Sequence, residues 1–94
     1  MKKEGLWEHF DEEGELTKSE TWENGQLESK GNYKDGKEDG LFEMYHDNGQ
    51  LGLKGNHKDG KQNGLWEMYS SDGQLWSTIC YDNGEKVDMS YCEK

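Results

Sequence analysis

The segments GLFEMYHDNGQLGLKGNHKDGKQN at residues 40–63 and GLWEMYSSDGQLWSTICYDNGEKV at residues 64–87 decide the fold, because they align without a gap. Their period is 24 residues. The positions that correspond are mainly glycines, leucines and ring-bearing residues: Gly40/Gly64, Leu41/Leu65, Phe42/Trp66, Met44/Met68, Tyr45/Tyr69, Gly49/Gly73, Leu51/Leu75, His57/Tyr81 and Gly60/Gly84. Such a fixed register predicts stacked repeats that bury one continuous core between neighbours.

A third unit opens in the same way, with GLWEHFDEEGEL at residues 5–16, and then gains eleven extra residues. The extra residues repeat one arm of the unit, because the leucine, ring and glycine spacing occurs twice in succession: Leu16, Trp22, Gly25 and then Leu27, Tyr33, Gly36. We therefore expect one domain over residues 1–94, with units of about 5–39, 40–63 and 64–88 and a tail at 89–94. Three units are about the minimum for a stable array.

Asn-Gly and Asp-Gly pairs separate the apolar runs, and they are the strongest local signal for a β-hairpin. The predicted fold is all-β, with tandem antiparallel β-hairpin repeats in a single elongated or curled sheet. In the second arm, alternate residues share one face, which we expect to point inward: Leu51, Leu53, Gly55 and His57, and Leu75, Ser77, Ile79 and Tyr81. Trp66 and Tyr69 lie three residues apart and cannot share a face of a regular strand without a bulge or an early bend. We expect one ring in the core and the other partly exposed.

The composition limits both the core and the partners. Apolar residues make up 29% and charged residues 34%, yet eleven residues are aromatic, which predicts a thin aromatic core. Arg is absent and the net charge is -10, which argues against direct binding of nucleic acid or anionic lipid. No apolar run reaches the length of a membrane span or signal peptide, so we expect a soluble, cytoplasmic protein.

The two cysteines, Cys80 and Cys92, form no recognisable disulfide framework or zinc pattern, and we expect them to be reduced thiols. The sheet should end in open edges guarded by charge. The charged residues beside these edges are Lys2, Lys3 and Glu4 at one end and Asp88, Glu93 and Lys94 at the other.

The unit G-x-[WF]-x-x-[YF]-x3-G-x-L-x5-[ring]-x2-G resembles the MORN repeat. It runs as Gly5-Trp7-Phe10-Gly14-Leu16-Trp22-Gly25, Gly40-Phe42-Tyr45-Gly49-Leu51-His57-Gly60 and Gly64-Trp66-Tyr69-Gly73-Leu75-Tyr81-Gly84. The phrases NGQLESKGNYKDGKEDG and NGQLGLKGNHKDGKQNG are similar to the bacterial variant found in YwqK-type antitoxins. The resemblance implies β-hairpin repeats that serve as a protein-interaction scaffold, and its bacterial branch implies neutralisation of a partner protein. It implies no catalytic chemistry.

The residues themselves give no sign of an enzyme. His9, His46 and His57 lie beside no nucleophile motif, and His57 takes the place of Tyr33 and Tyr81, so it is best interpreted as a ring in the core. Asp47-Asn48-Gly49 and Asp82-Asn83-Gly84 lack the rest of a calcium loop and fit hairpin turns. We expect no catalytic residue, no cofactor and no metal site.

Two features suggest a binding role. If Trp7, Phe42 and Trp66 form the aromatic ladder, the thin core cannot bury all of the remaining rings, which are Trp22, Tyr45, Tyr69 and Trp76. Exposed rings at a regular repeat suit a protein partner. A second, minor core on the other face of the sheet would also explain them. The excess of carboxylates suits a partner with a basic surface. The carboxylates expected to project from turns are Glu12, Glu13, Glu38, Asp39 and Asp47.

These features support two hypotheses. The first is a non-enzymatic protein-binding module that neutralises or scaffolds its partner. The alternative is an acidic mimic of nucleic acid, of phage or mobile-element type, that blocks a nucleic-acid-processing enzyme such as a CRISPR effector nuclease.

Overall fold

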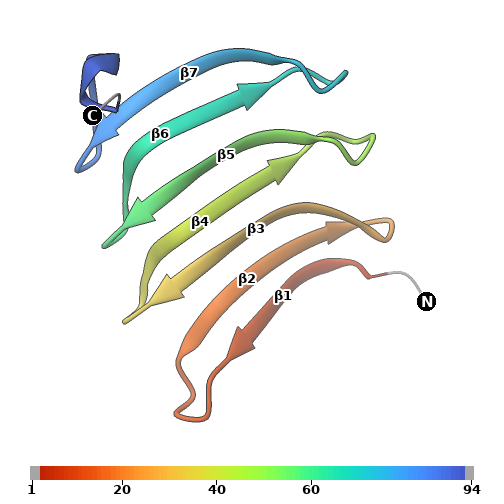
Figure 1. Ribbon diagram of the computed structural model, residues 1–94. Coiled ribbons are helices and arrows are strands. Elements are labelled where there is room, and N and C mark those ends of the chain that lie inside the picture. Colours follow the sequence, from red (N-terminus) through yellow and green to blue (C-terminus); the bar gives the residue numbers. More distant parts are fainter. Residues whose placement is uncertain (1–2, 93–94) are drawn as a thin grey trace.

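The computed structural model describes residues 3–92 and consists of one open antiparallel sheet (Figure 1). Its eight strands follow one another in space in chain order. They are β1 (Gly5–Phe10), β2 (Leu16–Glu23), β3 (Gln26–Lys34), β4 (Lys37–Tyr45), β5 (Leu51–Lys58), β6 (Lys61–Tyr69), β7 (Leu75–Asp82) and β8 (Glu85–Val87), followed by the 3-10 turn η1 (Met89–Tyr91). The predicted fold of tandem β-hairpins in one sheet is confirmed.

The short turns are formed by the Asn-Gly and Asp-Gly pairs. Asn24, Asp35, Asp59 and Asn83 all have φ near +52°, and the glycine after each also has positive φ. Two successive residues with positive φ make the tight turn whose twist matches antiparallel strands. These pairs therefore end one strand and start the next, as the sequence predicts.

Equivalent hydrogen bonds tie three of these turns to the chain segment that lies beside them. The amides of Gly25, Gly60 and Gly84 donate to the carbonyls of Lys3, Glu38 and Gln62 at 2.8 to 3.1 Å. A side chain one residue later accepts from the first turn residue in each case: Glu4 from Asn24, Asp39 from Asp59 and Asn63 from Asn83. The repeated contact fixes the register between successive hairpins.

The core is a row of rings on one side of the sheet, which we call the ladder face and define by Phe42, His57, Trp66 and Tyr81. The centroid of the Trp66 ring lies 5.0 Å from that of His57, 6.0 Å from that of Phe42 and 6.2 Å from that of Tyr81. Trp66 is only 3% exposed, and its Nε1 donates to the Asn56 carbonyl at 3.1 Å. The interpretation of His57 as a core ring is confirmed by its contacts with Phe42 and Trp66. As expected, Trp66 lies in the core while Tyr69 is half-buried, and the strand register shifts between Met68 and Tyr69.

Glycine makes room for the two ladder rings that lie over the neighbouring arm. A Cβ atom at Gly55 would lie 2.1 Å from Cδ2 of Trp66, and one at Gly31 would lie 3.1 Å from Cδ1 of Phe42. Ile79 occupies the equivalent position in β7, and the neighbouring strand β8 (Glu85–Val87) carries no ring. Thus glycine is present where the neighbouring strand brings a ring, and a side chain is present where it does not.

The first hairpin faces the other way, so Trp7 does not belong to the ladder. Directly paired residues share a face of a sheet, and Trp7 pairs with Glu20, Glu20 with Lys30, and Lys30 with Glu43. Glu43 is next to Phe42 in β4, so Trp7 and Phe42 lie on opposite faces. The inserted arm adds one strand. The long β1–β2 turn therefore lies at the same ends of the strands as the short turns of later units (Figure 1).

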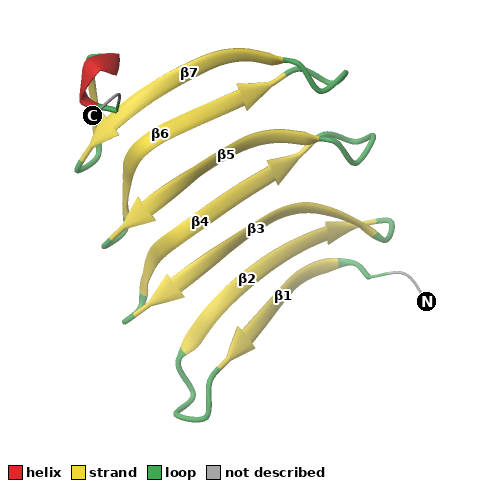
Figure 2. Cartoon of the chain, viewed as in Figure 1, coloured by secondary structure: helices red, strands yellow, loops and turns green. Residues whose placement is uncertain are grey.

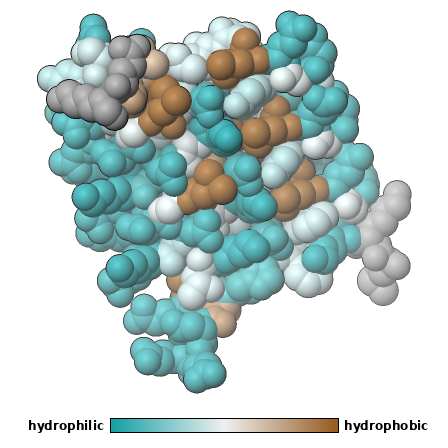
Figure 3. Space-filling model, viewed as in Figure 1, coloured by the Kyte–Doolittle hydropathy of each residue, from teal (hydrophilic) through white to brown (hydrophobic). Residues whose placement is uncertain are grey.

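The sheet is a single layer (Figure 2), with dimensions of 45 × 37 × 16 Å. Among the described residues, the buried apolar side chains are Trp66 and Cys80. Nine large apolar side chains are exposed: Leu6, Trp7, Phe10, Leu41, Met44, Leu65, Leu75, Trp76 and Tyr91. On the side seen in Figure 3, the hydrophobic side chains gather over the central strands among hydrophilic ones. A thin sheet of this kind leaves much of its apolar surface available.

The expectation that the cysteines are reduced is wrong, because Cys80 and Cys92 form a disulfide with a Cα–Cα distance of 6.0 Å. After β8, η1 turns the chain back toward β7, and the hydroxyl of Thr78 contacts the Met89 sulfur at 3.9 Å. Twelve residues separate the cysteines in sequence, and this reversal brings them together. Of the charged residues expected at the edges, Lys2, Glu93 and Lys94 lie outside the described residues.

Candidate interaction surface

The ladder face carries an apolar row beside its rings. Leu53 of β5 pairs with Met44 of β4 on one side and with Met68 of β6 on the other. Leu53 and Met68 are half-buried, whereas Met44 is 44% exposed. Methionine side chains adapt to differently shaped partners, which suits this row to protein contact.

The other side of the sheet, which we call the reverse face, carries alternating charges across its central strands. Lys30 lies 3.3 Å from Glu43 and Lys54 lies 3.8 Å from Glu67. The Tyr45 hydroxyl donates to Glu43 at 3.2 Å. The pKa of Tyr45 is raised, mainly by burial and then by the charge of Glu43. This part of the reverse face therefore satisfies its charges internally.

A cluster of rings and ions lies at the β1 end of the reverse face. The ammonium of Lys3 lies 4.9 Å from the centre of the Trp7 ring and 4.6 Å from that of Trp22. Nε1 of Trp22 donates to Glu20, and Nε2 of His9 lies 3.3 Å from the same carboxylate. Burial acts to raise the pKa of Glu20, but the hydrogen bonds with His9 and Trp22 outweigh it and lower the pKa.

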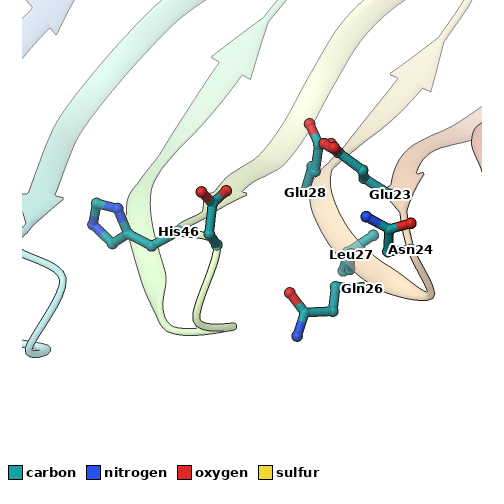
Figure 4. A pocket seen from close by; sticks show the side chains of 7 residues that line it. Glu23, Asn24, Gln26, Leu27, Glu28 and His46 are labelled. Atoms are coloured by element: carbon teal, nitrogen blue, oxygen red, sulfur yellow. The ribbon is translucent and has the colours of Figure 1, made fainter.

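A hollow of about 280 Å³ lies between the β2–β3 turn and the β4–β5 turn. Figure 4 shows the side chains of Glu23 and Glu28 converging there, while His46 points away. The hydrogen bond with Glu23, then burial and the nearby charges of Glu23 and Asp47, raise the pKa of Glu28. Within residues 3–92, no group of three or more His, Cys, Asp or Glu side chains could hold a metal ion.

The structure places the predicted aromatic contact residues at different depths. Trp76 of β7 is 65% exposed, as expected for at least one of these rings. Trp22, Tyr45 and Tyr69 are half-buried, and the carbonyl of Tyr69 accepts a hydrogen bond from Nε2 of His46 at 2.8 Å. These four rings do not converge on one site.

The predicted acidic contact residues separate into two groups. Glu12, Glu13 and Asp47 are exposed in turns, as expected. The placement of Glu38 and Asp39 in a turn is wrong, because both lie in β4 and are half-buried. The Asp35-Gly36 turn needs only two residues, so β4 already begins at Lys37, and Glu38 then lies 3.8 Å from His57.

The sequence reasoning missed two parts of the surface: the Met44, Leu53 and Met68 row, and the contact of Lys3 with Trp7 and Trp22. The row had a signal, because Met44 and Met68 occupy equivalent repeat positions. The contact of Lys3 with Trp7 and Trp22 had a weaker sequence signal, since it depends on which face Trp7 occupies.

Within residues 3–92, the structure contains no helix long and apolar enough to cross a membrane.

Comparison with known families gives one match. The family model described as "MORN repeat variant" matches residues 3–23, 19–35, 38–60 and 62–83. The match at 19–35 covers most of β2 and all of β3, where the arm is duplicated. No curated protein and no solved structure shows a significant match to the chain.

Proposed function

The chain belongs to the MORN repeat variant family, whose repeats are generally modules for binding proteins or membranes, and from this membership we propose that it is a non-enzymatic protein-binding module. In this role it binds a partner protein and neutralises or scaffolds it. The antitoxin-like role follows from the resemblance of its NGQL phrases to YwqK-type repeats, and it is part of the proposal.

The observation that carries this proposal is the imbalance between buried and exposed apolar side chains. Two apolar side chains are buried among the described residues and nine large ones are exposed. Exposed apolar patches on a soluble domain typically mark interaction surfaces, and aromatic residues supply much of the binding energy there. The Met44, Leu53 and Met68 row beside the ladder rings is an apolar strip that a partner could cover.

Affinity capture with matched variants tests the proposal. The tagged chain is incubated with lysate of its native host and washed at low or high salt, and retained proteins are identified. We expect one partner to survive high salt and to be lost with Met44→Glu, because a charge in an apolar contact is costly. Glu85→Gln on β8, which is exposed and lies outside the predicted contact residues, serves as a control that leaves capture unchanged. The same proteins retained by the wild type and Met44→Glu would contradict the proposal.

The acidic-mimic alternative rests on the charge distribution. The net charge is -10, and residues 4–15 contain six Asp and Glu residues but no Lys. A field of one sign attracts a basic channel, and salt screens it within about 10 Å at 0.1 M. A nuclease or other basic enzyme, such as a CRISPR effector, that is captured at low salt and released at high salt would favour this alternative. The carboxylates to replace first are Glu12 and Glu13.

We propose the cytoplasm as the working compartment. The Cys80–Cys92 disulfide makes this proposal testable, because cytosolic thiols are kept reduced. Trapping thiols with an alkylating reagent in intact cells, followed by mass spectrometry of the Cys92 peptide, decides between the compartments. A free Cys92 thiol in the cell supports the cytoplasm, and a protected disulfide contradicts it.

A further inference from the structure

We propose that the open edge of β1, together with the Trp7 and Trp22 rings beside it, docks an extended basic segment of the partner as an additional strand of the sheet. This inference rests on the proposed function, since it names the part of the partner that is held and the place that holds it. It is carried by three features of the described residues: an unprotected edge, a one-sided charge and a cation seated against two rings.

The two edges of the sheet are protected very differently. At the far edge, β8 has only three residues, which pair with residues 80–82 of β7, and η1 turns back against β7, to which the Cys80–Cys92 disulfide ties the chain. At the near edge, β1 has six residues, all of them exposed, and within residues 3–92 it pairs only with β2. Short or covered edge strands prevent unwanted pairing, whereas a longer bare edge is a template for another strand.

Leu6, Trp7 and Phe10 make this bare edge apolar as well as open, since they are 62%, 42% and 57% exposed. Alternating side chains of an added strand would lie against these residues, while its backbone bonds to β1. The edge therefore offers both the main-chain groups and the side-chain contacts that strand addition uses.

The charge around β1 selects a basic strand. Residues 4–15 contain six carboxylates and no Lys, and Glu8 lies within β1 itself. The neighbouring cations Lys3 and Lys18 already lie against the Trp7 and Trp22 rings and the Glu20 carboxylate, respectively. A second copy of this chain would bring the same negative charge to the edge, because its net charge is also -10. A Lys-bearing or Arg-bearing segment relieves this repulsion, and like charges placed opposite one another are destabilising in a sheet.

Lys3 shows which side chain the Trp7 and Trp22 rings accept. Its ammonium lies within 5 Å of both ring centres, which is the range of a cation–π contact. Glu20 lies beside these rings and accepts from Trp22. A basic side chain of the docked strand would exchange with Lys3 at these rings, so the rings select a cation at one position of the added strand.

The probe is a short peptide with blocked ends in which Lys alternates with Val and Thr. Two matched peptides serve as controls: one has Pro in place of alternate Val residues, and the other has Glu in place of Lys. Binding is measured by calorimetry, and amide hydrogen exchange locates the site. We expect the Lys peptide to protect the β1 amides that do not bond to β2, and the Pro and Glu peptides to bind at least tenfold more weakly.

Matched variants separate the site from general attraction. Glu8→Lys should weaken peptide binding more than Glu85→Lys on β8, although both change the net charge equally. Trp7→Ala should weaken it about two- to fivefold by loss of the cation–π contact, and the exposed Trp76→Ala should leave it unchanged. Circular dichroism of each variant confirms that the sheet is folded, and Trp7→Phe, which keeps a ring, should recover part of the affinity.

Three results would overturn the proposal. The Pro peptide could bind as well as the Lys peptide, protection could fall on β4 to β7 instead of β1, or the chain could form a dimer through β1 that the peptide cannot displace. A captured partner that protects only the ladder face would refute this docking mode and leave the proposed function intact. Failure to capture any partner, with the peptide still protecting β1, would refute the proposed function instead.

Discussion

Replacing Gly55 by Ala should destabilise the sheet through a single contact, the one with the Trp66 ring. The new Cβ atom would lie 2.1 Å from Cδ2 and 2.3 Å from Cε2 of Trp66, whereas ordinary contact begins at 3.4 Å. The ring must therefore move by about 1.3 Å, the difference between 3.4 and 2.1 Å. It is only 3% exposed and flanked by His57 and Phe42, so it has little room to do so.

The expected loss of stability follows from these contacts. Overpacking a filled core costs about 1–3 kcal/mol, and weakening the Trp66 Nε1 bond to Asn56 adds about 1 kcal/mol. The alanine also restricts the unfolded chain, which offsets about 0.4–1 kcal/mol. We expect a net loss of about 1–3.5 kcal/mol. Gly31→Ala is the matched control, and it should lose less, because its Cβ would lie 3.1 Å from the more accessible Phe42 ring.

A double-mutant cycle measured by urea unfolding and far-ultraviolet circular dichroism tests this reasoning. Trp66→Ala alone should lose roughly 3–5 kcal/mol, and adding Gly55→Ala to it should have almost no further effect, because the obstructing ring is gone. If Trp66→Ala does not fold, Trp66→Leu serves as the second background. An equal loss from Gly55→Ala with and without the ring would refute the steric explanation, as would equal losses at Gly55 and Gly31.

Three further predictions concern the tail, the acidic hollow and an exposed ring. Cys92→Ala should lower the unfolding free energy by about 2–4 kcal/mol, since it opens the loop closed to Cys80, and a reducing agent should lower the melting temperature of wild type but not of the variant. Glu28→Gln should raise the melting temperature at pH 7. The folded-state pKa of Glu28 is raised above 4.5, so the wild type loses stability as the pH rises through the folded-state pKa of Glu28. The gain from the substitution should therefore vanish in acid. An equal gain at all pH values would contradict the Glu23–Glu28 explanation. Trp76→Ala should leave the melting temperature almost unchanged, because this ring is 65% exposed.

The sequence was enough to predict the turns and the fold. Asn24, Asp35, Asp59 and Asn83 adopt the positive φ that a two-residue hairpin turn needs, and each is followed by glycine. These are local preferences, so they do not depend on distant contacts. The repeat period likewise predicted that His57 would lie in the ring row, because a shared repeat position means a shared environment.

The facing of the first hairpin could not be predicted from the same local pattern. Trp7 matches Phe42 and Trp66 in the repeat, yet it lies on the reverse face, because the pairing across β2 and β3 aligns it with Glu43 and not with Phe42. A one-residue change in register moves every side chain to the other face. The sequence does show that one arm is inserted in the first unit. One extra antiparallel strand reverses the direction in which β1 runs relative to β4.

Two predictions were wrong: the reduced state of the cysteines and the placement of Glu38 in a turn. Cys80 and Cys92 meet because η1 reverses the chain after β8, and nothing in their spacing indicates this reversal. Glu38 follows a turn that is complete after two residues, so a charged residue enters the strand and lies near His57. In both cases a tertiary contact decides the outcome, and local residue preferences do not register it.

The reversed hairpin also limits how a partner could contact both sets of rings. The ladder rings and the Met44 row face one side of the sheet, while Trp7 and Trp22 lie on the other side at the β1 edge. The sheet is only 16 Å thick, but a segment lying flat on the ladder face cannot reach both sets of rings without passing around the border of the sheet. The shortest such path for a partner docked as proposed is across β1, where the backbone is open. Mutations in the Met44 row and at Trp7 should then act independently on a partner that uses one surface and together on a partner that wraps around the edge.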